Sequence, residues 1–133
     1  MSLQILIADD DLDDLELLEE SLLDVRPGTD IDKAIGGKAA INFLSTYPDS
    51  RLPALIILDY NMPDLSGLGV LAYLNEHSRY QNIPRIMFST SGAERYVSES
   101  LKLGATKYFV KPKTKKELDE MALQMLALAD AGL

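Results

Sequence analysis

Carboxylate side chains follow two short apolar runs of this sequence. Asp9 and Asp10 come directly after Leu3–Ala8, and Asp59 comes directly after Leu55–Leu58. Three carboxylates in a small volume repel one another, so either a divalent cation or raised pKa values must relieve the repulsion. A site of oxygen ligands with open positions suits Mg²⁺, which keeps several waters and accepts phosphate oxygens. We therefore expect a magnesium site if the two runs end side by side.

A hydroxyl group and an ammonium group follow two further apolar runs. Ser89 comes after Ile86–Phe88, and Lys111 comes after Tyr108–Val110. A lysine supplies a compact positive charge to a phosphoryl oxygen, and a serine hydroxyl can donate a hydrogen bond to another. The two side chains therefore predict a site that handles a phosphoryl group.

Asp59 is the natural nucleophile of such a site. A carboxylate beside magnesium can attack a phosphoryl group and form an acyl phosphate, because the metal neutralises charge on the transferred oxygens. Asp59 stands alone at the end of its run, whereas Asp9 and Asp10 are adjacent and suited to bracketing a metal. We assign Asp59 as the attacking group.

The elements that must position these residues are strands alternating with helices. The four apolar runs have the length and composition of buried strands and are expected to be central, whereas Thr29–Ile35 has the half-solvated pattern of a sheet edge. Five intervening segments show helical spacing of apolar residues. They are centred on Leu15–Val25, Ala40–Leu44, Leu68–Leu74, Val97–Leu101 and Leu118–Leu128. Arg26–Gly28 and Gly104 are expected to end the first and fourth helices, and Ser66–Gly67 to begin the third.

Five such alternations predict a doubly wound α/β domain, with a parallel sheet covered by helices on both faces. In these folds the active crevice lies at the carboxyl ends of the strands. All four sets of polar residues follow strands, so we expect them to converge there.

The composition excludes several classes of site and partner. The 133 residues contain no cysteine and one histidine, which excludes thiolate chemistry and multi-histidine metal sites. A net charge of −8 argues against nucleic acid as a partner. No apolar run approaches the roughly 20 residues that span a bilayer, and Met1–Gln4 lacks the features of a signal peptide. We expect one cytoplasmic domain, residues 1–133, without an attached output domain or a membrane partner.

Each polar residue also has a purely structural interpretation. Asp59 alone can cap a turn, Ser89 can cap a helix, Lys111 can extend along the surface, and Tyr108 can be a core aromatic. The acidic run from Asp11 to Asp14 is interpreted as a solvated helix start. The placement of four separate elements at matching strand ends favours a functional site.

The chain resembles the receiver family of response regulators, the CheY-like superfamily, along nearly its whole length. The segments that carry the resemblance are Ile5–Asp11, Leu55–Gly67, Phe88–Ser91 and Gly104–Pro112. The resemblance implies a flavodoxin-like (βα)5 fold of three layers with the strand order 2-1-3-4-5.

It further implies that Asp59 accepts a phosphoryl group from a phosphohistidine of a sensor histidine kinase or a histidine phosphotransfer protein. Asp10, Asp59 and the main-chain carbonyl of Asn61 would bind Mg²⁺ directly, and Asp9 would act mainly through water. The resulting acyl phosphate makes the chain a signalling phosphoacceptor of a bacterial two-component system, which promotes only its own phosphorylation and dephosphorylation.

The resemblance implies a switching apparatus as well. Ser89 and Lys111 would contact the phosphate, Tyr108 would be the aromatic that turns inward, and the Lys111–Pro112 peptide would be cis. Asn61 and Ser91 occupy positions that tune dephosphorylation in the family.

The output surface would be the face formed by the fourth helix, the fifth strand and the fifth helix. An unidentified downstream protein would bind there, and the same face is a candidate homodimer interface. Lys113, where the family often has phenylalanine, predicts a more polar face. Thr90, where the family commonly has alanine or glycine, predicts restricted access to the phosphate.

Two other functions compete with this reading. The first is a phosphorylation-independent adaptor, against which the intact Asp59 and Lys111 weigh. The second is an aspartyl-phosphate hydrolase of the haloacid dehalogenase type. Enzymes of that type carry an Asp-x-Asp motif at the nucleophile, whereas this chain has Asn61 in place of the second aspartate. We also expect no cap domain to close over a substrate.

Overall fold

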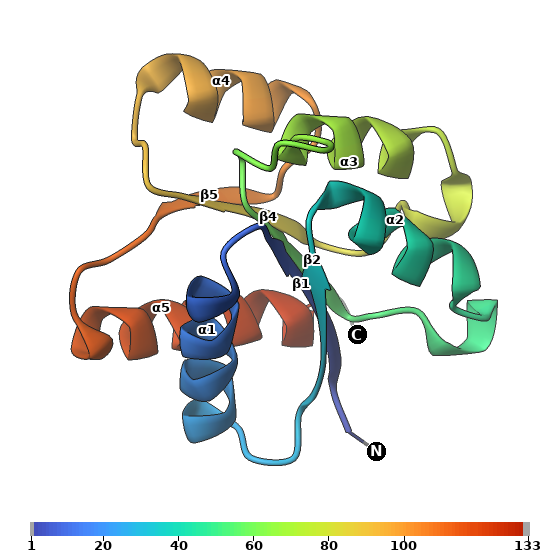
Figure 1. The fold of residues 1–133 in the computed structure, drawn as a ribbon. Coiled ribbons are helices and arrows are strands. Elements are labelled where there is room, and N and C mark those ends of the chain that lie inside the picture. The colour runs from blue at the N-terminus through green and yellow to red at the C-terminus, as the bar shows by residue number, and fades with distance from the viewer. Residues whose placement is uncertain (1, 132–133) are drawn as a thin grey trace.

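The computed structural model describes residues 2–131. Within these residues five strands alternate with five α-helices (Figure 1). The strands are β1 (Gln4–Asp9), β2 (Asp30–Ile35), β3 (Leu55–Leu58), β4 (Arg85–Ser89) and β5 (Lys107–Val110). The helices are α1 (Leu12–Val25), α2 (Gly37–Thr46), α3 (Gly67–Asn75), α4 (Glu94–Lys102) and α5 (Lys115–Ala131). Two short 3₁₀ turns, η1 (Asp49–Arg51) and η2 (Ser78–Tyr80), lie before β3 and β4.

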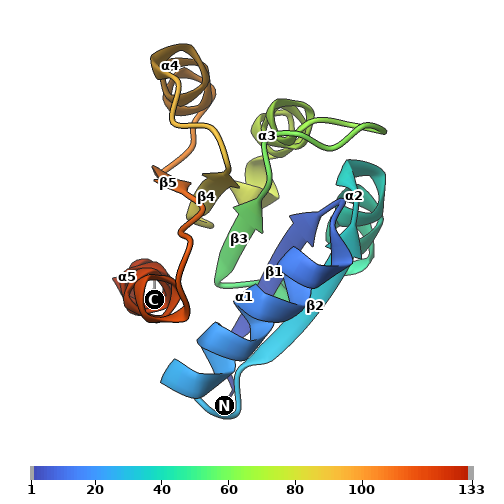
Figure 2. The same ribbon diagram turned by 60° about the vertical axis from the view of Figure 1, so that its left-hand side comes forward.

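The strands form one parallel sheet in the order β2-β1-β3-β4-β5. Helices α1 and α5 cover one face, and α2, α3 and α4 cover the other, as Figures 1 and 2 show. Successive residues of a strand point to opposite faces, so Ile5 and Ile7 join the core under α1 and α5, while Leu6 and Ala8 join the second core. The predicted three-layer fold and strand order are confirmed.

Of the two edge strands, one was predicted as an edge strand and the other was not. β2 pairs with β1 alone, as its half-polar pattern predicted. β5 was expected to be central, and this was wrong, because it pairs with β4 alone and leaves Val110 42% exposed. With only four residues, Lys107–Val110 is too short for its apolar content to show whether it has one neighbouring strand or two.

The helix boundaries follow the predicted turn residues. α1 ends before Arg26, α4 ends before Gly104, and Gly104 adopts a φ of 102°, where a side chain would be strained. Ser66 caps α3, and its side chain accepts a hydrogen bond from the main-chain N–H of Gly69. No helix within residues 2–131 combines the length and the apolar character needed to cross a membrane.

Candidate functional site

Three carboxylates meet at the carboxyl ends of β1 and β3. The parallel pairing of these strands places Ala8 beside Leu58, and the main-chain N–H of Asp59 donates to the carbonyl of Ala8 at 2.9 Å. Asp9, Asp10 and Asp59 each offer one oxygen within 4.8 Å of the others. Asp9 and Asp59 are buried and Asp10 is exposed, so the cluster opens to solvent on one side. The predicted convergence of these residues is confirmed.

Lys111 brings its ammonium group into this cluster from the end of β5. Its main-chain N–H donates to the carbonyl of Ser89 at 2.7 Å, which fixes the start of the loop. The Nζ atom lies 2.6 Å from Asp9 Oδ2 and 3.5 Å from Asp59 Oδ2. Only 11% of the lysine side chain is exposed. The ammonium therefore neutralises part of a buried negative cluster.

Asp14 also belongs to the site, although the sequence analysis interpreted it as part of a solvated helix start. Its Oδ2 atom lies 2.9 Å from the Nζ atom of Lys111. The Asp11 side chain caps α1 by accepting from the main-chain N–H groups of Asp13 and Asp14, which sets the rotation of the first turn. The capping pattern was readable in the sequence. The direction in which the third helical residue points depends on how α1 packs.

The pKa values of the site reflect its crowding. Burial, the largest effect, raises the pKa of Asp9 despite its bond to Lys111, and the pKa of Asp10 is raised by partial burial and by Asp9. Burial alone would lower the pKa of Lys111, but hydrogen bonds from its ammonium to Asp9 and Asp14 raise it overall.

A divalent cation fits this donor set. The three clustered side chains offer carboxylate oxygens, and Asp10 faces solvent, which leaves space for water ligands. A cation would also relieve the repulsion that contributes to the raised pKa of Asp9. The acidic triad is therefore able to bind a divalent metal.

The loop after Asp59 is fixed at two points. A β-carbon added to Gly67 would lie 2.4 Å from the carbonyl oxygen of Asp59, so only glycine allows this approach. Further along the loop, the Asp64 carboxylate accepts from the main-chain N–H groups of Gly37 and Lys38, both at 3.1 Å, at the start of α2. These main-chain bonds, chiefly that of Lys38, lower the pKa of Asp64. The loop is therefore held at Asp64 and at Gly67, both on the C-terminal side of Asp59.

Ser89 and Tyr108 belong to one hydrogen-bonded segment. Ser89 is fully buried, and its Oγ atom accepts from the main-chain N–H of Ser91 at 3.4 Å. The Tyr108 hydroxyl donates to the carbonyl of Ser91 at 2.5 Å. The loop between β4 and α4 is thereby tied to both residues for which the sequence predicts a switching role.

One predicted feature of the site is wrong: the Lys111–Pro112 peptide is trans, as are the other peptide bonds of residues 2–131. An X-Pro bond favours trans by only about 0.5–1 kcal/mol, so a Lys-Pro pair in the sequence does not determine the isomer. With the trans bond, Lys111 still reaches Asp9 and Asp14.

A tyrosine next to Asp59 links the site to α4, and no sequence pattern predicted this contact. The buried Tyr60 hydroxyl donates to Glu99 Oε2 at 2.8 Å, and its ring stacks on Tyr96 with the centroids 4.5 Å apart. Glu99 lies 39 residues further along the chain, so the contact is visible only once the fold is known.

Comparison with known proteins agrees with this geometry. The model of the response regulator receiver domain family matches residues 5–123. Chemotaxis protein CheY1 of Helicobacter pylori is 34% identical over 101 residues, which cover 76% of this chain and 79% of CheY1. A Bacillus subtilis transcriptional regulatory protein, YrkP, is 31% identical over 126 residues, which cover 95% of this chain and 50% of YrkP.

Solved structures show the same fold. The phosphorylated cyanobacterial phytochrome response regulator RcpA superposes with a TM-score of 0.88 over 100% of this chain and 97% of that one, at 23% identity. The Mn²⁺-bound form of response regulator Rcp1 superposes with a TM-score of 0.80 at 29% identity, over 93% of this chain and 91% of Rcp1. Receiver domains are signalling phosphoacceptors rather than enzymes in the usual sense, and they partner with histidine kinases. The acidic triad, the lysine beside it and the matched family model show that this chain belongs to the response regulator receiver domain family.

Proposed function

We propose that Asp59 is the residue of this receiver domain that accepts the phosphoryl group from a histidine kinase or a histidine phosphotransfer protein. The observation that carries the assignment is the unequal sharing of Lys111. Asp9 Oδ2 is 2.6 Å from its ammonium, whereas Asp59 Oδ2 is 3.5 Å away. Asp59 therefore combines burial with a loosely engaged oxygen, which a nucleophile requires.

In the proposed reaction an Asp59 oxygen attacks the phosphorus of a phosphohistidine. The new O–P bond forms as the N–P bond breaks, and the imidazole leaves with the electron pair and takes up a proton. Asp10, Asp59 and the main-chain carbonyl of Asn61 would hold Mg²⁺, with Asp9 acting mainly through water. The bound ion would supply positive charge to the transferring phosphoryl oxygens.

Lys111 and Ser89 would then hold the phosphorylated state. The Lys111 ammonium is already inside the cluster, and a small shift would bring it to a phosphoryl oxygen. A turn of the buried Ser89 hydroxyl toward the phosphate would change its contact with Ser91, whose carbonyl holds Tyr108. We infer that the signal leaves the site through this loop and reaches the α4–β5–α5 face, where a downstream protein or a second copy of the chain would bind.

Phosphorylation by a small phosphodonor tests the acceptor. We expect the wild-type chain to gain the mass of one phosphoryl group when incubated with acetyl phosphate and Mg²⁺, and the Asp59→Asn variant to gain none. Asp30→Asn is a matched control, because Asp30 is an exposed aspartate at the opposite end of the sheet. The same incubation with a chelator in place of Mg²⁺ tests the metal requirement.

Three results would contradict the proposed function. An unchanged mass of the wild type, under conditions that label a known receiver domain, would favour a phosphorylation-independent adaptor. Labelling of Asp59→Asn to the wild-type extent would place the phosphoryl group on another residue. Steady turnover of an external phosphomonoester would indicate a hydrolase instead.

A further inference from the structure

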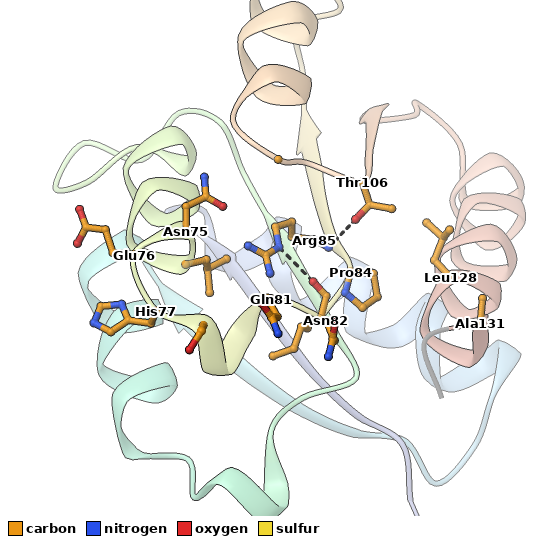
Figure 3. Close-up of a pocket in the computed structure, with 14 residues that line it drawn as sticks. Asn75, Glu76, His77, Gln81, Asn82, Pro84, Arg85, Thr106, Leu128 and Ala131 are labelled. Atoms are coloured by element: carbon orange, nitrogen blue, oxygen red, sulfur yellow. Dashed lines mark hydrogen bonds between the residues drawn. The ribbon is translucent and has the colours of Figure 1, made fainter.

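A cavity lies at the end of the sheet opposite Asp59. Its volume is about 820 Å³, and it is bordered by the ends of α3 and α5, by η2, and by the first residues of β4 (Figure 3). β4 runs between the two sites, since Arg85 begins the strand beside the cavity and Ser89 ends it near the acceptor. The cavity therefore shares no residue with the carboxylate cluster.

The guanidinium of Arg85 points into this cavity (Figure 3). The residue is only 5% exposed, and no carboxylate within residues 2–131 forms an ion pair with it. A buried charge is expensive unless it is paired. Burial lowers the pKa of Arg85, but an arginine whose ordinary pKa exceeds about 12 stays charged near neutral pH. The cavity therefore holds a positive charge that no acid within the described residues neutralises.

A structural role accounts for only part of this arginine. Its Nε atom donates to the carbonyl of Ile83 at 3.1 Å, and its Nη2 atom donates to the carbonyl of Tyr80, which together hold the turn before β4. The remaining guanidinium N–H groups have no acceptor among residues 2–131. These donors have the geometry that binds the oxygens of carboxylate and phosphate groups.

The rest of the lining suits a small organic anion. The exposed residues Gln81, Asn82 and Ser78 contribute amide and hydroxyl groups to the lining, while Ile83 and Leu128 contribute apolar surface. Glu76 is the only acid among the lining residues, and it is exposed at the rim. An anionic head group at the arginine and a short carbon body on the apolar residues would complement this lining.

We propose that this cavity binds a small organic anion whose carboxylate or phosphate group accepts hydrogen bonds from the Arg85 guanidinium. The proposal does not depend on which aspartate accepts the phosphoryl group. Its ligand would stabilise the turn before β4, the strand whose far end carries Ser89.

Backbone amide NMR of the ¹⁵N-labelled chain tests the proposal. Inorganic phosphate and butyrate are titrated separately without Mg²⁺, and sodium chloride at matched ionic strength is the control. We expect saturable shifts in residues 76–85 and 104–106 with one or both anions and not with chloride. A response to phosphate alone points to a phosphorylated ligand, and a response to butyrate alone points to a carboxylic acid.

Two exposed positions provide variants with opposite expected effects. Gln81→Glu adds a negative charge to the lining, and Glu76→Gln removes one. Charge pairs at exposed positions are weak, so we expect affinity to fall by about twofold to fivefold in the first and rise by a similar factor in the second. Arg85→Gln should abolish saturable binding. If that variant does not fold, the two rim variants decide the question.

Three results would overturn the proposal. One is a set of shifts that chloride reproduces at the same ionic strength. Another is saturable shifts confined to the residues around Asp59 and Lys111, which would assign the anion to the acceptor site. The third is equal affinity in wild type, Gln81→Glu and Glu76→Gln.

Discussion

Replacing Lys111 by methionine tests how much the buried ammonium contributes to the fold. The substitution keeps most of the side-chain volume and removes hydrogen bonds of 2.6 Å to Asp9 and 2.9 Å to Asp14. The Asp9 side chain is 7% exposed, so its carboxylate would be left buried without a counter-charge. Removing one partner of such a pair typically costs about 3–5 kcal/mol. Because Asp14 is 35% exposed and can turn to water, we expect a loss of about 3 kcal/mol near neutral pH, at the lower end of that range.

Lys115→Met is the matched control. Lys115 also contacts two carboxylates, Asp24 at 2.8 Å and Asp119 at 2.7 Å, but its side chain is 40% exposed. Exposed ion pairs contribute little to stability, so we expect a much smaller loss in this variant. Urea unfolding followed by circular dichroism, with a chelator present, measures both. Equal losses in the two variants would refute the reasoning, because burial would then not determine the contribution of the lysine.

The difference in stability between the wild type and Lys111→Met is expected to depend on pH. Lys111 has a raised pKa when folded, so its contribution is present throughout the neutral range and is lost only as pH rises through that value. Asp9 already has a raised pKa, and losing the lysine raises it further. Below that pKa Asp9 is neutral and needs no counter-charge. The deficit of Lys111→Met should therefore shrink as pH falls through the pKa of Asp9, and a constant deficit would contradict the proposed cause.

Three further substitutions probe the surroundings of the acceptor. Gly67→Ala places a β-carbon against the carbonyl of Asp59, and overpacking of this kind costs about 1–3 kcal/mol, which urea unfolding would measure. Tyr60→Phe removes the hydrogen bond to Glu99, so we expect a loss of about 1 kcal/mol and faster amide hydrogen exchange in α4, which unchanged exchange would contradict. The family resemblance assigns Ser91 to a position that tunes dephosphorylation, so the long side chain of Ser91→Arg should shield the phosphoryl group from water and lengthen the lifetime of the phosphorylated chain. Mass spectrometry after removal of the phosphodonor would show this, and an unchanged or shorter lifetime would refute it.

The alternation of strands and helices was predictable because each element is specified locally, whereas the strand order came from the family resemblance. Apolar runs such as Leu55–Leu58 are buried on both faces, and turn residues such as Ser66 and Gly104 lie where the structure has helix boundaries. Parallel strands bring their carboxyl ends to one edge of the sheet, so residues that follow the strands had to meet. The predicted meeting of Asp59 and Lys111 depended on this topology alone.

The features that the sequence did not predict depend on packing or on small energy differences. Asp14 reaches Lys111 only because α1 has a particular rotation against the sheet. The hydrogen bond between Tyr60 and Glu99 depends on how α4 is placed over the loop after β3, which no local sequence pattern determines. The isomer of the bond before Pro112 depends on a difference of about 0.5–1 kcal/mol, which the surrounding fold can reverse.

The position of Lys111 explains why a charge added at Asp59 would be felt in more than one segment. The ammonium is shared among three carboxylates: Asp9 at the end of β1, Asp59 after β3 and Asp14 in α1. A phosphoryl group on Asp59 would draw the ammonium toward itself, and the bond most easily given up is the one to Asp14, whose side chain is 35% exposed, against 7% for Asp9. The first turn of α1 would then lose a contact at the same time as the loop after β4 gains one. Two surfaces of the domain, one at α1 and one at α4, would therefore depend on a single charge at Asp59.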